Sequence, residues 1–467
     1  MIQSAFARAT PLALGAIAFA FAVTGCSRST HSADTNPSDQ PASLSAAARL
    51  PTGARLDPAG RSTPLGNMPL AAIPSPDGRD IVVSLSGWRE QGLQVVDRAS
   101  GALVQRLPQS GAFLALAFSA DGSMLYASGG VTDRVYIYRW RAQASTAPAT
   151  LIDSIKMSGA AIAQGDSAPP GSRYVAGLAL SRDGRTLYVA ENLADSLAVV
   201  DVASRRIVQK LGTGSYPYAV LTSSDGRVYV SDWGAGSVHV YHALASGKLA
   251  AERSIDVGRH PSALALSADG TRLFAASAST DRVAVIDTRA RRVLRWLLDP
   301  PPADLAEGST PNALALSSSG TRLYVAEADA NAVAVFDLSS LASGIDSANG
   351  NDTLAGRIPT EWYPTAVLAQ SADSLLVVNG KGRGAGPNPT GPRPDAKRED
   401  DDPHAYTLGQ LNGTLTALAA PRGEALDMLS HRVAEANGWT AHRTPFKYPP
   451  IEHVIYRSEE RRVGKEC

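Results

Sequence analysis

Residues that could perform chemistry are spread thinly along the chain. The eight histidines are dispersed, and the sequence has no Ser/His/Asp arrangement, HExxH helix, CxxC pair or phosphate-binding glycine loop. One group does recur beside prolines that precede apolar segments: Tyr216, His260, Asn312 and Tyr363. If these prolines begin equivalent strands, the four side chains gather in one place and could meet a small-molecule or protein ligand. The alternative is that the prolines only start strands and the aromatic rings pack against the surrounding rim.

A second candidate is the acidic run Glu399-Asp400-Asp401-Asp402, with His404 nearby. Clustered carboxylates can bind Ca²⁺, but this spacing matches no calcium loop. A run of like charges in a Pro- and Gly-rich segment is typical of a solvated loop. We therefore expect no metal site and no cofactor in this chain.

A sequence unit recurs along the chain, and the structure that it forms must position any functional site. An apolar segment leads into Ser-x-Asp-Gly, a segment like Leu-Tyr-Val-Ala, a polar turn, and a segment like Val-Ala-Val-x-Asp. The turn recurs at 76–78, 120–122, 182–184, 224–226 and 268–270, and in degenerate form at 318–320 and 372–374. Most copies are about 40–50 residues apart, the length of a four-stranded propeller blade. The longer intervals need loop insertions, of which residues 141–171 are the clearest.

The composition of the unit fits β-structure. Asp-Gly between two apolar runs favours a hairpin, because glycine accepts the positive φ of the turn. Runs such as 283–287 and 333–337 are apolar without interruption, as expected of strands covered on both faces. Seven copies predict an all-β, seven-bladed β-propeller over residues 55–421; six or eight blades are the alternatives. Residues 413–418 resemble a third strand of the last blade, and a stretch near 55–65 would supply its outermost strand.

The N-terminus has the features of an export signal. Arg8 precedes an apolar run, residues 11–23, which is too short to span a bilayer. The run ends in Val23-Thr24-Gly25-Cys26, which resembles a bacterial lipobox. We therefore predict a signal peptide over 1–25, lipidation of Cys26, and a flexible tether over 26–54. The expected location is the periplasmic side of the outer membrane or the cell surface, with the membrane as partner. The alternative is an ordinary signal peptide.

Charge and cysteine content narrow the function classes. Lys plus Arg and Asp plus Glu number 44 each, so no basic surface for a nucleic acid is indicated. The two cysteines are Cys26 and Cys467. A lipidated Cys26 would leave no disulfide within the chain.

Two segments of the chain resemble known families. Residues 187–192, followed by 197–201, resemble the YVTN family of β-propeller repeats, and the likeness covers most of 69–421. Residues 362–366, 379–382, 386–389 and 411–415 resemble the last blade of bacterial proteins that join a propeller to an alkaline-phosphatase-like, phospholipase-C-like phosphoesterase domain. The resemblance implies that 422–456 form a linker, with a helix at 423–438, and the first strand of that domain. It also implies divalent metal ions for the domain itself, which this chain would lack.

The likeness breaks at Arg457. Residues 457–467 are abruptly charged where a buried strand should continue, and they resemble a translated sequencing adapter. The main hypothesis is thus the propeller region, for binding or scaffolding, of an exported lipoprotein whose intact parent is a metal-dependent phosphoesterase. The alternatives are a stand-alone envelope scaffold and, more weakly supported, a propeller lactonase.

Overall fold

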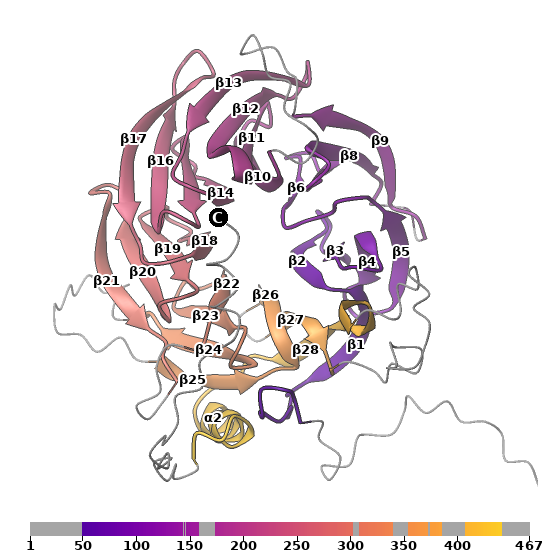
Figure 1. The fold of residues 1–467 in the computed structure, drawn as a ribbon, viewed down its shortest axis with the longest axis vertical. Coiled ribbons are helices and arrows are strands. Elements are labelled where there is room, and N and C mark those ends of the chain that lie inside the picture. The colour runs from indigo at the N-terminus through magenta and orange to yellow at the C-terminus, as the bar shows by residue number, and fades with distance from the viewer. Residues whose placement is uncertain are drawn as a thin grey trace, which may run out of the picture. The chain divides into compact units, whose positions relative to one another are not determined.

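The described part of the chain forms a ring of sheets. The computed structural model describes residues 49–142, 144, 146–157, 173–301, 308–339, 354–371, 374–384 and 407–440, which belong to one compact unit, 47–467. Seven four-stranded antiparallel sheets surround a common axis (Figure 1). The predicted seven-bladed β-propeller is confirmed. Among the described helices, none is both long and apolar enough to cross a membrane.

Blades 1 to 6 each contain four strands that follow one another in the chain, the first being innermost (Figure 1). Blade 1 contains β2 (Pro69–Pro74), β3 (Asp80–Ser86), β4 (Gln91–Asp97) and β5 (Leu103–Pro108). Blade 2 contains β6 (Leu116–Phe118), β7 (Met124–Ser128), β8 (Arg134–Trp140) and β9 (Ala149–Lys156). Blade 3 contains β10 (Val175–Leu180), β11 (Thr186–Glu191), β12 (Ser196–Asp201) and β13 (Arg206–Gly212), with the short helix η3 (Asn192–Ala194) between β11 and β12.

The next three blades repeat this arrangement. Blade 4 contains β14 (Pro217–Thr222), β15 (Arg227–Asp232), β16 (Ser237–Ala243) and β17 (Leu249–Asp256). Blade 5 contains β18 (Pro261–Leu266), β19 (Arg272–Ser277), β20 (Arg282–Asp287) and β21 (Arg292–Leu298). Blade 6 contains β22 (Pro311–Leu316), β23 (Arg322–Glu327), β24 (Ala332–Asp337) and β25 (Leu354–Pro359).

Blade 7 joins the two ends of the propeller. Its inner strands are β26 (Trp362–Ser371), β27 (Ser374–Gly382) and β28 (Asn412–Ala419), with the short helix η4 (Thr407–Gln410) before β28. Its outermost strand is β1 (Arg61–Asn67), which pairs antiparallel with β28. The hydroxyls of Ser62 and Thr416 are hydrogen-bonded across this pair at 2.8 Å. The predicted third strand and closing strand are confirmed, although β1 begins at Arg61 rather than near 55.

The Ser-x-Asp-Gly turns join the first and second strands. Ser119 Oγ donates to Asp121 Oδ1 at 2.5 Å, and the backbone N–H of Ser123 donates to the same oxygen at 3.1 Å. The same pattern recurs at Asp269. These hydrogen bonds, from the serine hydroxyl first, lower the pKa of Asp121 and of Asp269 to about 2. The turn aspartates are therefore engaged in holding the turns.

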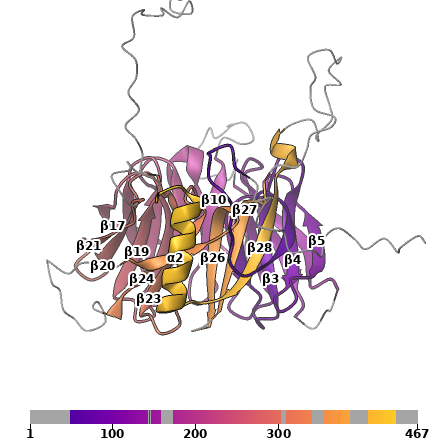
Figure 2. The same cartoon turned by 90° about the horizontal axis from the view of Figure 1, so that it is seen from below.

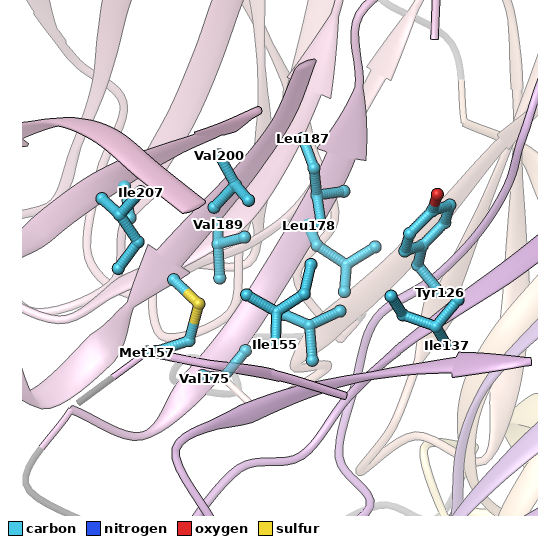
Figure 3. Packing of buried hydrophobic residues seen from close by; sticks show 12 residues of the cluster. Tyr126, Ile137, Ile155, Met157, Val175, Leu178, Leu187, Val189, Val200 and Ile207 are labelled. Carbon is cyan, nitrogen blue, oxygen red and sulfur yellow. The ribbon is translucent and has the colours of Figure 1, made fainter. Parts of the chain in front are cut away.

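Neighbouring blades bury their second and third strands against each other. Figure 3 shows one such contact, where Ile137 and Ile155 of blade 2 meet Leu187 and Val189 of blade 3. Tyr188, which alternates with these leucine and valine side chains, packs instead with blade 4. Each side chain of this size contributes roughly 1.5–3 kcal/mol on burial. Both faces of a central strand are thus covered, as its uninterrupted apolar sequence predicts.

Helix α2 (Glu424–Ala436) lies on the outside of the ring beside β25 (Figures 1 and 2). Its Leu426 and Val433 are buried, and the N–H of Arg357 in β25 donates to Ser430 Oγ at 2.8 Å. The predicted helix is present, and Gly438 follows it with φ of 68°.

The last residues of the predicted tether lie in this unit. Leu50 is buried, and the N–H of Arg55 donates to the carbonyl oxygen of Ala436 at the end of α2 at 2.8 Å. Residues 49–54 are therefore held against the propeller unit. Cys26, the signal peptide, the acidic run 399–402 and residues 441–467 lie outside the described residues.

Candidate binding site on the upper face

One face of the ring carries the start of every first strand and the turn between every second and third strand. We call it the upper face; it is uppermost in Figure 2, where η4 projects from it. Six residues at the start of first strands have a left-handed backbone, with φ between 49° and 64°. Five directly precede the strand, namely Met68, Tyr174, Tyr216, His260 and Thr310, and Tyr363 is the second residue of β26. Non-glycine residues seldom adopt this conformation, so neighbouring contacts must hold it.

For Tyr174, Tyr216, Thr310 and Tyr363, a contact comes from the preceding blade. An Asp or Asn ends the turn before the third strand, itself with positive φ, at Asp133, Asp195, Asp281 and Asn331. Its side-chain oxygen accepts the backbone N–H of the left-handed residue of the next blade: Asp195 from Tyr216 at 2.8 Å, and Asn331 from Tyr363 at 3.0 Å. Each such hydrogen bond joins one blade to the start of the next. Its sequence signal is an Asp or Asn immediately before the third strand, and these residues were not among the predicted site residues.

Blades 4 and 5 present an aromatic stack on this face. The rings of Trp233 and His260 are parallel, with centroids 3.8 Å apart. Tyr216 meets Trp233 edge to face at 6.5 Å. The edge of the His260 ring is held by Ser279, whose Oγ lies 2.6 Å from His260 Nδ1. Tyr216 and Trp233 are 45% and 38% exposed, so the stack is available to a ligand.

A second aromatic group lies nearer the axis. Phe113 contacts Tyr174 and Tyr218 edge to face, at centroid distances of 5.0 and 6.1 Å. Gly177 allows β10 to approach β14, because a Cβ there would lie 2.2 Å from the Tyr218 carbonyl oxygen. Burial, followed by the nearby hydroxyls of Tyr363 and Tyr174, raises the pKa of Tyr218 to about 12. Blades 2, 3, 4 and 7 therefore contribute side chains to this axial group.

Lys381 completes the axial group from the end of β27. Its Nζ lies over the ring of Tyr363 at 3.9 Å and over that of Trp362 at 5.0 Å. Burial lowers the pKa of Lys381, and the charge of Asp329 opposes this shift. Asp329 Oδ2 accepts the hydroxyl of Thr310 at 2.6 Å. The axial group thus combines apolar ring surface with one cation.

The four residues singled out in the sequence separate into different groups. Tyr216 and His260 lie in the outer stack, while Tyr363 lies in the axial group. Asn312 is half-buried within β22 and belongs to neither. The residue equivalent to Tyr216, His260 and Tyr363 is Thr310, because all four immediately precede the proline of a first strand. Asn312 is two positions later, in the place that Tyr218 occupies in blade 4.

Exposed apolar side chains recur in the turns between second and third strands. Four consecutive blades carry one each: Trp88, Val131, Leu193 and Trp233. Their positions follow directly from the repeat, since each lies within a few residues of the end of the second strand. A grouped set of exposed apolar residues marks a binding surface more often than scattered ones do.

The buried carboxylates at the upper ends of the second strands have a structural role. The second strands of blades 3, 4 and 6 end in Glu191, Asp232 and Glu327, all without solvent exposure. Lys210 Nζ lies 3.0 Å from Glu191, and Arg357 lies 2.8 Å from Glu327. Within the described residues, no group of His, Cys, Asp and Glu is arranged to hold a metal ion.

Hollows between blades occur on the lower face. One of about 540 Å³ between blades 2 and 3 is lined by Asp121, Asp183 and Arg205, among others. The aspartates belong to the turns described above, and Arg205 pairs with Asp153. Because these aspartates already accept hydrogen bonds within their turns and Arg205 is in an ion pair, the upper face is the stronger candidate site.

Comparisons with known proteins find a similar fold among solved structures. No protein-family model matches it, and no curated protein sequence does. Among solved structures, hydrazine synthase of Kuenenia stuttgartiensis is 20% identical, over 68% of this chain and 93% of that chain, with a TM-score of 0.52. U3-55K is 15% identical over 76% and 98%, with a TM-score of 0.54.

A third similar structure is virginiamycin B lyase from Staphylococcus aureus with quinupristin, 11% identical over 77% of this chain and 99% of that chain, with a TM-score of 0.51. At these identities the likeness shows the propeller fold alone. Propellers support both binding and catalysis, so function must be argued from the site.

Proposed function

We propose that this chain is a ligand-binding propeller and that its ligand binds on the upper face. The observation that carries the proposal is the convergence there of aromatic side chains from several blades, Phe113, Tyr174, Tyr218, Tyr363 and the Tyr216–Trp233–His260 stack. Rings of this kind supply large contact areas at low conformational cost. No covalent chemistry is needed for this role.

The site can be tested by a thermal-shift screen of a defined small-molecule library. We expect compounds that raise the melting temperature of the unmodified chain to lose that effect in Trp233→Ala or Tyr363→Ala. The matched control is Leu244→Ala, since Leu244 is 42% exposed on the lower face. Compounds whose effect survives both upper-face substitutions but disappears in Leu244→Ala would place the site elsewhere and contradict the proposal.

We further propose that the propeller belongs to an exported lipoprotein anchored through Cys26. The support is the lipobox-like sequence at 23–26 after an apolar run. Expression in a bacterial host with radiolabelled palmitate should label the chain, whereas Cys26→Ser should abolish the label and keep the protein out of the membrane fraction. Equal labelling of both forms would refute the anchor.

A phosphoesterase parent is the second candidate. The segments that resemble the last blade of propeller–phosphoesterases, residues 362–366 and 411–415, do fall in or beside β26 and β28 of blade 7. The gene beyond Tyr456 tests this proposal. A continuing frame with a Glu-Asn-Arg-Thr segment, and metal-dependent hydrolysis of a phosphate ester by its product, would support it; a stop codon there would refute it.

A further inference from the structure

Lys381 differs from Lys210 and Arg357, two other buried cations of the described residues. Lys210 and Arg357 each contact a carboxylate within 3.0 Å. Lys381 is half-buried, yet within the part of the chain that the structure describes its Nζ meets only the ring faces of Trp362 and Tyr363. Partial removal of an ammonium group from water is unfavourable when no carboxylate lies at ion-pair distance, and Asp329 acts on Lys381 only from further away. Such a group is best explained by a site that receives an anion.

The neighbouring hydroxyls fit the same ligand. The phenols of Tyr174, Tyr218 and Tyr363 are protonated at neutral pH, as ordinary tyrosines are, and burial raises the pKa of each further. A protonated phenol can donate a hydrogen bond to an anionic oxygen. The one carboxylate that acts on Lys381 through its charge, Asp329, already accepts the Thr310 hydroxyl.

The rest of the axial group offers apolar surface. Phe113, Tyr174 and Tyr218 form an edge-to-face cluster from three successive blades. Aromatic rings pair favourably with a further ring at centroid distances of about 4.5–7 Å. Tyr363 links this cluster to Lys381, because its ring lies under Lys381 Nζ and its hydroxyl acts on the pKa of Tyr218.

We propose that this axial group binds an aromatic monocarboxylate, with the carboxylate on Lys381 and its ring against Phe113, Tyr174 and Tyr218. The inference rests on the proposed function and names the class of ligand. Recognition is non-covalent: the ammonium and phenols donate to the carboxylate oxygens, and the aromatic cluster covers the ligand ring. An aliphatic anion as small as acetate lacks the ring contact and should bind more weakly.

The test uses 2-naphthoate as probe, with 2-naphthylmethanol as its uncharged analogue, in calorimetric titrations of the full chain. We expect 2-naphthoate to bind, and Lys381→Met to weaken it about tenfold or more, the usual consequence of losing a hydrogen bond to a charged group. The same substitution should change the affinity for 2-naphthylmethanol less than threefold. Methionine retains an apolar stem over the two rings, and Lys248→Met, on the exposed lower face, is the control.

The outcomes separate the two proposals. Binding of 2-naphthoate that is equally strong in Lys381→Met would overturn the ligand class. Binding of 2-naphthylmethanol but not of 2-naphthoate, lost in Tyr218→Ala, would also overturn it while leaving an upper-face site in place. If neither probe binds and the library screen yields no upper-face compound, both proposals fail. As a folding check, Lys381→Met should unfold at the same or a higher denaturant concentration, because no ion pair is removed.

Discussion

Replacement of Arg357 by methionine should lower the free energy of unfolding by about 3–5 kcal/mol. The guanidinium lies between two carboxylates that have no solvent exposure, with Nε 2.9 Å from both oxygens of Glu327 and Nη2 3.4 Å from Asp299 Oδ1. Burial, followed by the charge of Glu327, raises the pKa of Asp299 well above its ordinary value, against the effect of Arg357. Without the cation, the charge shared by Glu327 and Asp299 is left buried and uncompensated. Urea titration followed by tryptophan fluorescence measures the loss.

Two further variants make this prediction specific. Arg106→Met removes an ion pair with Glu90 at 2.7 Å whose arginine side chain is 55% exposed, and it should cost less than about 1 kcal/mol. Combining Arg357→Met with Glu327→Gln and Asp299→Asn should restore most of the lost stability, because no charge is then buried alone. A single variant as stable as the unmodified chain would show that the carboxylates are neutral or hydrated, and the prediction would be wrong.

The repeat architecture could be predicted because its signals are local. The Ser-x-Asp-Gly turn needs a glycine with positive φ and a serine two residues before the aspartate, and both are visible within four residues. Gly122, Gly184 and Gly270 have φ of 69–71°. The uninterrupted apolar third strands report burial on both faces without knowledge of their neighbours. The number of turns therefore favoured seven blades, and the strand order within a blade follows from the repeated unit.

The site could be predicted only in part because its members come from different places in the unit. Tyr216, His260 and Tyr363 share one position, directly before a proline, and that much is visible. Lys381 lies near the end of β27, the second strand of blade 7, and Trp233 lies in the turn after β15, the second strand of blade 4. Trp233 contacts His260 of the next blade. Alignment on the prolines identifies Thr310, rather than Asn312, as the fourth equivalent.

The buried ion pairs could not be predicted from the sequence either. The acidic residue that ends a second strand, such as Glu327, is visible in the sequence, but its partner Arg357 lies on the outermost strand of the same blade, 30 residues later. The spacing between such partners changes with each insertion. A sequence pattern can therefore identify the carboxylate but cannot predict whether it is paired, exposed or catalytic.

The second large effect concerns closure of the ring by β1. A chain that begins at Met68 should lose on the order of 5 kcal/mol relative to one that begins at Arg49. Leu65 is buried with Leu415 and Val378, which contributes about 1.5–3 kcal/mol. The strand also forms the ladder with β28, and the N–H of Gly66 donates to Gln94 Oε1 of blade 1 at 2.9 Å. Each such hydrogen bond contributes a further 0.5–1.5 kcal/mol approximately.

Loss of β1 also exposes the edge of β28, and an exposed edge strand invites pairing with another chain. We therefore expect the chain that begins at Met68 to self-associate in light-scattering measurements, and a synthetic peptide of residues 59–67 to restore the monomer and much of the stability. The shortened chain also lacks the contact of Asp57 with Arg432 of α2, so Arg432→Met in the longer chain measures that contribution separately. A monomeric Met68 chain as stable as the Arg49 chain would show that three strands suffice for blade 7. Leu65→Asp in the longer chain, which buries a charge in the same cluster, should reproduce the instability without any deletion, and that result would assign the effect to closure by β1 itself.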